Sequence, residues 1–189
     1  MRKWLISAAC AAMLSASAQG ETLEYSTAGN WRIAVDPSLG NGCFVIGDFT
    51  QGTSIRLGFN FHDDNAEFYI LFGNAKWRSI EYGKNYSVQL QFGEKPKWEG
   101  NAQGFSFDPP ESQSFLELTI VKNQVGELIK EFMQEKNLTL DYNKKEILRL
   151  SLKNSFNAGL KLFECLQSMI NENQDPFRDT APKTGDPFR

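Results

Sequence analysis

The chain has 189 residues, of which 41% are hydrophobic and 13% aromatic, and this composition excludes a disordered protein. The length fits one domain with its own core. It carries 20 basic and 23 acidic residues, a net charge of −3, with no basic cluster. This charge distribution argues against nucleic acid and anionic membrane surfaces as partners.

Residues 1–18 have the pattern of a secretory signal peptide. Arg2 and Lys3 form a short positive region, residues 4–14 are apolar, and an Ala-Ser-Ala cleavage sequence ends at Ala18. No later run approaches the ~20 apolar residues of a transmembrane helix. We therefore expect cleavage near Ala18, a mature chain with no transmembrane segment, and a periplasmic or secreted location. Without residues 1–18, which contain two basic and no acidic residues, the net charge becomes −5.

Cleavage also changes the cysteine count. Cys10 lies in the apolar part of the leader and lacks the leucine expected three positions before a lipidation cysteine, so Cys43 and Cys165 remain. An isolated pair in an oxidising compartment predicts one disulfide between Cys43 and Cys165. The alternative is two buried free thiols.

The segment from residue 21 to about residue 152 shows mainly period-two patterning, which is typical of β-strands. Residues 68–72 are apolar at every position, which predicts a central strand covered on both faces. Alternation of apolar and polar side chains predicts further strands at residues 31–36, 55–61, 86–92 and 116–120. These runs are separated by turn residues at regular spacing. We predict a β-rich α+β domain, an antiparallel β-sandwich or half-barrel of about eight to ten strands with two helices late in the chain.

Two segments depart from this pattern. Apolar residues at helical spacing predict an amphipathic helix over residues 123–136, capped by Asn123. A hairpin should then pair residues 138–142 with residues 146–152 across Asn143 and Lys144.

A second helix is predicted over residues 155–171. Cys165 falls on the flank of its predicted buried stripe, and Cys43 opens a strand over residues 44–49, so the bridge should fasten this helix to the edge or end of the sheet. The stripe consists of Phe156, Leu160, Phe163, Leu166 and Ile170.

The domain organisation predicted is a signal peptide over residues 1–18, one globular domain over 19–173 and a disordered tail over 174–189. The tail repeats Asp-Pro-Phe-Arg, which places Phe177 and Phe188 in equivalent positions. Two interpretations stay open: a solvated tail with a chance repeat, or a docking motif whose phenylalanines fill a pocket in a partner.

Catalytic and metal signatures give no candidate. His62 is the only histidine and lies beside Asp63 and Asp64 in a predicted turn, where polar residues are expected in any case. A two-histidine metal site is excluded, and no glycine-rich loop precedes a helix. We predict no metal, no cofactor and no catalytic residue, and leave open an unrecognised hydrolase.

Three aromatic residues could bind sugar rings by stacking. Trp77 and Trp98 are surrounded by charged residues, and Tyr82 precedes a turn at Gly83. They form a candidate ligand platform for envelope polysaccharide or peptidoglycan; the alternative is that they cover the core of the domain.

The segments Gly29-Asn30-Trp31-Arg32-Ile33, Gly42-Cys43-Phe44 and Leu162-Phe163-Glu164-Cys165 resemble small exported alphaproteobacterial proteins of unknown function. They resemble more loosely the invasion-associated locus B type. The resemblance implies a periplasmic or secreted β-rich protein without established catalysis, and carries over no catalytic residue.

These observations together favour a non-enzymatic exported module that binds another envelope or secreted protein. A carbohydrate-binding module is the second hypothesis and a hydrolase the third. The sequence leaves the oligomeric state open.

Overall fold

The computed structural model describes residues 22–61, 66–106 and 114–173. The strands are β1 (Leu23–Ala28), β2 (Trp31–Asp36), β3 (Gly42–Phe49), β4 (Thr53–Asn60), β5 (Glu67–Asn74), β6 (Asn85–Phe92), β7 (Trp98–Ser106), β8 (Ser114–Ile120), β9 (Asn137–Tyr142) and β10 (Lys145–Ser151). The helices are α1 (Val125–Gln134) and α2 (Ser155–Asn173), with short 3-10 turns at Pro37–Leu39, Thr50–Gly52 and Lys122–Gln124.

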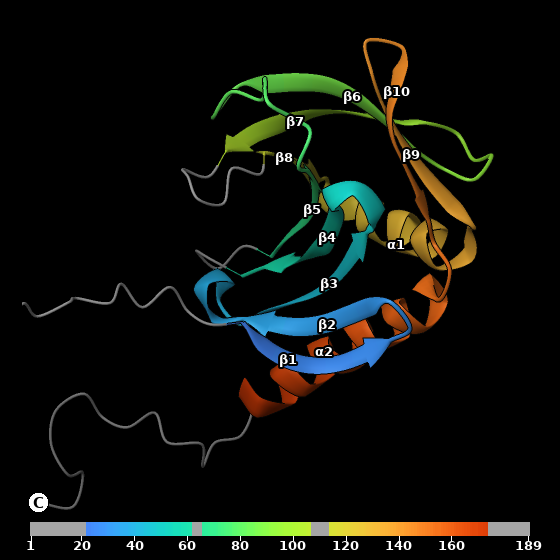
Figure 1. Ribbon diagram of the computed structural model, residues 1–189. Helices are drawn as coiled ribbons and strands as arrows, with labels where there is room; N and C mark the ends of the chain where they lie inside the picture. Colours follow the sequence, from blue (N-terminus) through green and yellow to red (C-terminus); the bar gives the residue numbers. More distant parts are fainter. Residues whose placement is uncertain (1–21, 62–65, 107–113, 174–189) are drawn as a thin grey trace, which may run out of the picture.

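The ten strands of the described residues belong to one antiparallel sheet, in the order β1-β2-β3-β4-β5-β8-β7-β6-β9-β10. The sheet is strongly curved, and both helices lie on its concave side (Figure 1). The prediction of a β-rich α+β fold with two helices late in the chain is confirmed. Among the two forms predicted, the curved single sheet corresponds to the half-barrel.

The core lies between the concave face of the sheet and the helices. Alternate residues of each strand point inward, as the period-two pattern predicts, and β5 is buried on both faces over most of its length. The predicted central strand is therefore confirmed. The largest fully buried side chains include Trp31, Phe68, Phe72, Phe92 and Phe132.

The two edges of the sheet approach each other around α1. The indole Nε1 of Trp31, on β2, donates a hydrogen bond of 2.9 Å to the carbonyl of Lys153, just after β10. The backbone N–H of Leu152 donates to the carbonyl of Lys136 at 2.9 Å, and the Trp31 ring meets Phe132 of α1 edge to face. These contacts nearly close the curved sheet into a barrel filled by α1.

The predicted hairpin is confirmed, but the predicted helix cap is not. Asn143 and Lys144 both have positive φ, 51° and 62°, as a two-residue turn between strands requires. Asn123 lies instead inside the 3-10 turn before α1, and Gln124 occupies the N-cap position without a side-chain hydrogen bond. The 3-10 turn puts Gln124, and not Asn123, at the position before the helix, so α1 begins one residue later than a cap at Asn123 requires.

Helix α2 presents the opposite face to the one predicted. Its buried residues are Ser155, Ala158, Gly159, Leu162 and Cys165, whereas Phe156 is exposed. Of the predicted buried stripe, Leu160, Phe163 and Ile170 are also exposed, and Leu166 is half-buried. The helix has two apolar faces, and periodicity alone does not say which one meets the sheet.

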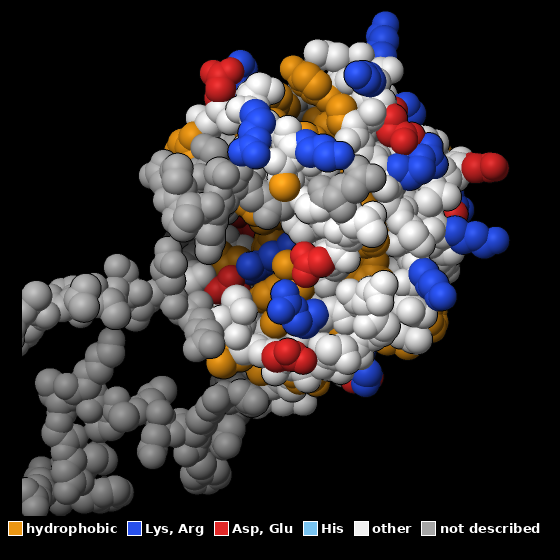
Figure 2. Space-filling view, viewed as in Figure 1, with side chains coloured by type: hydrophobic (Ala, Val, Ile, Leu, Met, Phe, Trp, Pro, Cys, Tyr) orange, Lys and Arg blue, Asp and Glu red, His pale blue; other side chains and the backbone are white. Residues whose placement is uncertain are grey.

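Figure 2 shows one face of the molecule, where basic and acidic side chains are interspersed and hydrophobic side chains appear between them. Within the described ranges, no helix is long and apolar enough to cross a membrane.

Candidate functional site

The candidate site is a hollow on the convex face of the sheet, over β4, β5 and β8. Its volume is about 200 Å³. The residues that line it are Asp36, Leu39, Arg56, Asn60, Glu67, Tyr69, Leu71, Glu117 and Thr119. Strand register brings the central ones together, because Arg56 pairs with Leu71 across β4 and β5, and Leu71 pairs with Glu117 across β5 and β8. Paired residues of neighbouring strands point to the same face.

Arg56 is the structural centre of the hollow. Its Nη2 donates to Oδ2 of Asp36 at 2.7 Å, and its Nε donates to the Tyr69 hydroxyl oxygen at 2.6 Å. The guanidinium carbon lies 3.7 Å above the centroid of the Phe44 ring, which is buried on the same convex face. The Arg56 and Asp36 side chains are 19% and 9% exposed. This half-buried arginine, held by Asp36, Tyr69 and Phe44, forms a rigid floor.

Asp36 is held from both sides. Its Oδ1 accepts hydrogen bonds from the backbone N–H of Ser38 at 2.9 Å and from the Ser38 hydroxyl at 2.5 Å. Burial alone would raise the pKa of Asp36, but the hydrogen bonds from Ser38 and Arg56 and the charge of Arg56 outweigh burial and lower it. Burial raises the pKa of Tyr69 to about 12, although the charge of Arg56 opposes the rise. Asp36 is thus ionised and Tyr69 neutral at physiological pH.

Glu117 has the opposite environment. Burial raises the pKa of its carboxyl group, the charge of Glu67 raises it further, and Arg56 opposes both. Because Arg56 is engaged by Asp36, the hollow keeps an excess of negative charge at Glu67 and Glu117. Leu39 and Leu71 supply apolar wall beside these carboxylates. This combination suits a ligand with an apolar stem and a cationic end.

Two other hollows are larger but carry no comparable arrangement. One, about 690 Å³, is lined by Gly93, Glu94, Lys95, Gln134, Glu135, Lys136, Asn137 and Arg149. The other, about 390 Å³, is lined by Phe49, Thr50, Thr53, Asn74, Ile147, Leu148, Arg149, Leu150 and Ser151. In the first, basic and acidic side chains are mixed, and Lys95 and Glu135 approach each other at 3.9 Å. Neither shows a half-buried charge held in place as Arg56 is.

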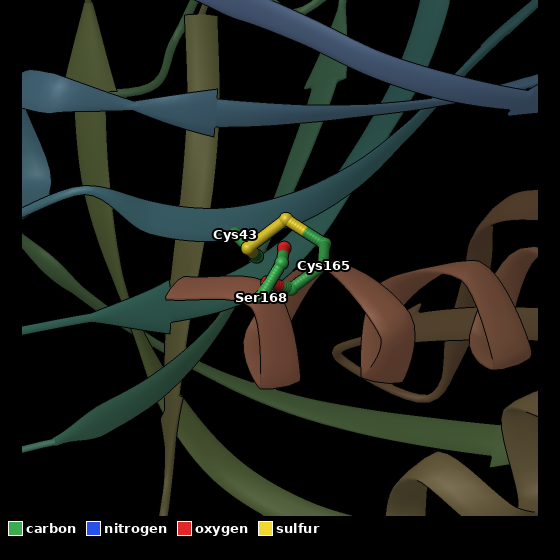
Figure 3. Close-up of a disulfide and its surroundings, with 3 residues drawn as sticks. All are labelled: Cys43, Cys165 and Ser168. Carbon is green, nitrogen blue, oxygen red and sulfur yellow. A yellow bond between two sulfur atoms is a disulfide. The ribbon is translucent and has the colours of Figure 1, made fainter. Parts of the chain in front are cut away.

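The predicted disulfide between Cys43 and Cys165 is confirmed. The two Cα atoms are 6.1 Å apart, and both residues are completely buried (Figure 3). The bridge joins α2 to the start of β3, and the Ser168 hydroxyl donates to the Cys165 carbonyl at 2.8 Å. The expected attachment at a strand end is correct. Cys165, however, lies at the centre of the buried face of α2 and not on its flank.

The predicted aromatic platform is not assembled. Trp98 lies at the start of β7 and donates from Nε1 to the buried Glu131 of α1 at 2.7 Å, so it faces the core. Tyr82 is 74% exposed and contacts Phe105 at the other end of β7. Trp77, in the loop after β5, is half-buried and packs against the core. Trp77 and Trp98 therefore cover the core, which is the alternative that the sequence left open.

The remaining candidate residues lie outside the described part of the chain. These are His62, Asp63 and Asp64 of the predicted turn, and Phe177 and Phe188 of the predicted tail motif. Within residues 22–61, 66–106 and 114–173, no group of three or more His, Cys, Asp or Glu side chains is placed to hold a metal ion.

Comparison with known proteins supplies no name for this site. No family model, curated protein or solved structure matches the chain. The resemblance to exported alphaproteobacterial proteins stays a prediction.

Proposed function

We propose that this chain is an exported, non-enzymatic module that binds another envelope or secreted protein through the convex-face hollow. The hollow would receive a lysine or arginine side chain of the partner, with its methylenes against Leu39 and Leu71 and its charge between Glu67 and Glu117. The observation that carries the proposal is this pair of carboxylates above Arg56, whose guanidinium is already engaged by Asp36.

The size of the hollow supports a single side chain as its occupant. Sites for drug-sized molecules and cofactors usually span about 300–1,000 Å³, whereas this hollow holds about 200 Å³. A protein partner that inserts one basic side chain would obtain the rest of its contact from the surrounding sheet surface. Such buried basic anchors are typical of the energetic centres of protein interfaces.

The electrostatics support the same occupant. The pKa of Glu117 is raised by burial and by the charge of Glu67, so an added cation would relieve an unfavourable interaction already present. The net charge of −5 expected after cleavage would also steer a basic partner toward this protein.

Export is supported by the leader pattern and by the buried Cys43–Cys165 bridge, since disulfides persist in oxidising compartments. The mass of the protein recovered from the producing cells tests this part directly. A product that begins near Gln19 in periplasmic extract or culture fluid is expected, and an intact leader in the cytoplasm would contradict it.

Site-directed photocrosslinking in the producing cells tests the binding proposal. A diazirine amino acid at the exposed Thr119, on the hollow, should capture a specific partner, and the same group at the exposed Lys144 turn should not. Mass spectrometry of the crosslink should map the contact to a lysine or arginine segment of that partner. Equal crosslinking from both positions would contradict the proposal.

A charge-matched pair of variants gives the control. The double variant Glu67→Gln and Glu117→Gln should reduce capture at least tenfold, a free-energy loss of about 1.4 kcal/mol or more. The double variant Glu94→Gln and Glu127→Gln removes the same charge from exposed positions outside the hollow and should leave capture unchanged. Equal losses in both would assign the binding to net charge and not to the hollow.

A further inference from the structure

Helix α2 carries an apolar stripe that faces away from the sheet. Phe156, Phe163 and Ile170 are 54%, 42% and 54% exposed, and Leu160 beside them is 43% exposed. We call these four residues the α2 stripe. Single exposed apolar residues are ordinary, but the α2 stripe places four large ones along one line of a helix. Contiguous apolar surface of this kind marks an interaction site.

The helix cannot turn to bury the stripe. Its opposite face, with Ala158, Leu162 and Cys165, is fully buried, and Cys165 is bonded covalently to Cys43 of β3. The disulfide therefore fixes the rotation of α2 about its axis. Because α2 contacts β1, β2 and β3 on the concave side, its stripe points away from the convex-face hollow.

The spacing of the stripe identifies its occupant. Phe156, Phe163 and Ile170 are seven residues apart and so lie along one line of the helix. When a second copy of α2 is laid antiparallel with the two-fold axis beside Phe163, Phe163 meets its own symmetry mate and Phe156 meets Ile170 of the other copy. A symmetric dimer requires such self-complementarity, whereas an unrelated partner does not.

We propose that the α2 stripe binds a second copy of this chain, as an antiparallel helix pair centred on Phe163. With about 200 Å² for each of the four side chains, the size of an aromatic one, and about half of each exposed, the stripe offers on the order of 400 Å² of apolar surface. A stable interface buries about 800 Å² per partner, with an apolar core inside a polar rim. The stripe supplies the core of such an interface, and the polar residues flanking it on α2 supply part of the rim.

The test begins with the mass of the oxidised chain by sedimentation velocity, between about 1 μM and about 1 mM. The weight-average mass should rise toward twice the monomer value with concentration. Phe163→Glu, at a position already exposed, should abolish the rise while leaving the far-ultraviolet circular dichroism unchanged. Asn157→Glu, on the same helix but outside the stripe, is the matched control and should dimerise like the unchanged chain.

Disulfide trapping tests the symmetry directly, with the Cys43–Cys165 bridge kept intact. Phe163→Cys should form a covalent dimer under mild oxidation, because the two-fold axis brings the new thiols together. Phe156→Cys and Ile170→Cys should give little dimer alone and a covalent heterodimer when mixed. Asn157→Cys should give none.

Three results would overturn the proposal. One is a monomer at every concentration with no trapped species. A second is a dimer that persists in Phe163→Glu and is not trapped through Phe163→Cys, which would place the interface elsewhere. The third is a Phe163→Cys thiol that reacts with alkylating reagents only after residues 174–189 are removed, which would assign the stripe to the C-terminal segment of the same chain.

Discussion

The Cys43–Cys165 disulfide is expected to supply a large share of the stability of this domain. The bridge closes a loop over a sequence separation of 122 residues. In the chain-entropy treatment, a loop of that length contributes about 5 kcal/mol by restricting the unfolded chain, and removal of natural disulfides usually costs about 2–5 kcal/mol. Domains of this kind are stable by only about 5–15 kcal/mol in total, so reduction should remove a substantial part of the free energy of unfolding.

Urea titrations of the oxidised and reduced chain, followed by tryptophan fluorescence and circular dichroism, measure this contribution. The reduced sample is prepared by unfolding in reductant and refolding, because both sulfur atoms are completely buried. With a urea dependence of about 2 kcal/mol per M, a loss of about 4 kcal/mol moves the midpoint down by about 2 M.

The double variant Cys43→Ala and Cys165→Ala separates the cross-link from packing. In the reduced chain both sulfur atoms still fill their sites, so the further loss in the double variant reports the cavities left by sulfur. A reduced chain within 1 kcal/mol of the oxidised one would refute the loop argument. Reductant should leave the double variant unchanged, which controls for its other effects.

Arg56→Ala leaves the buried Asp36 carboxylate without its cation and should cost about 3 kcal/mol in urea titrations; Arg56→Lys should recover only part, because a single ammonium nitrogen does not reproduce the planar fork that bonds Asp36 and Tyr69 through two separate nitrogens. The pKa of Asp36 is lowered, so its contribution is present above the unfolded-state pKa and is lost as pH falls through the folded value; an Asp36→Asn variant should not show this loss between about pH 5 and pH 2. The pKa of Glu117 is raised, so its ionised form opposes folding at neutral pH. Glu117→Gln should therefore be more stable than the unchanged chain at pH 7 by about 0.2–1 kcal/mol. This difference in stability should vanish below the unfolded-state pKa of Glu117. Trp98→Phe deprives the buried Glu131 of the indole donor and should cost about 1–3 kcal/mol; unchanged thermal and urea midpoints would show that this hydrogen bond contributes nothing.

Most strands of the sheet were predictable because burial of one face imposes a period of two on the sequence. Strand β7 was not among the runs that the pattern identified. Its inward positions include Gly100, Ala102 and Gly104, since larger residues would collide there: a Cβ at Gly100 would lie 2.6 Å from Leu118 Cδ1, and one at Gly104 2.4 Å from the Glu81 carbonyl oxygen. A strand whose inner face is small gives no hydrophobic alternation.

The orientation of α2 was not predictable from periodicity. The helix has a small-residue face with Ala158 and Cys165 and a large-residue face with Phe156 and Phe163, and hydrophobicity favours the second for the core. The cross-link decides the matter, because Cys165 must reach Cys43. The bond to Cys43 allows only one rotation of α2 about its axis, whereas an apolar stripe can be covered by another partner instead of the sheet.

The sequence indicates some residues of the convex-face hollow but not how they meet. Alternation predicts Arg56 on the outward face, and the continuous apolar run at residues 68–72 predicts that something covers the outward Tyr69. The group that covers Tyr69 is the Arg56 guanidinium, which bonds the Tyr69 hydroxyl, lies over the Phe44 ring and is fixed by Asp36. The sequence does not reveal this set because Asp36 and Arg56 meet only through the register of β2, β3 and β4, which depends on the turns between them.

The two proposed surfaces lie on opposite faces of the same strands. Phe44 of β3 lies beneath the Arg56 guanidinium on the convex face, while the neighbouring Cys43 points to the concave side and holds α2. A dimer through the α2 stripe therefore leaves both hollows open, one per copy. Linked sites of this kind bind a surface with repeated basic side chains far more tightly than one hollow does, because the second contact forms at high effective concentration. Phe163→Glu should accordingly weaken binding to a densely immobilised basic peptide much more than binding to the same peptide free in solution. Equal weakening of both would indicate that the stripe contributes to the hollow itself and not to dimerisation.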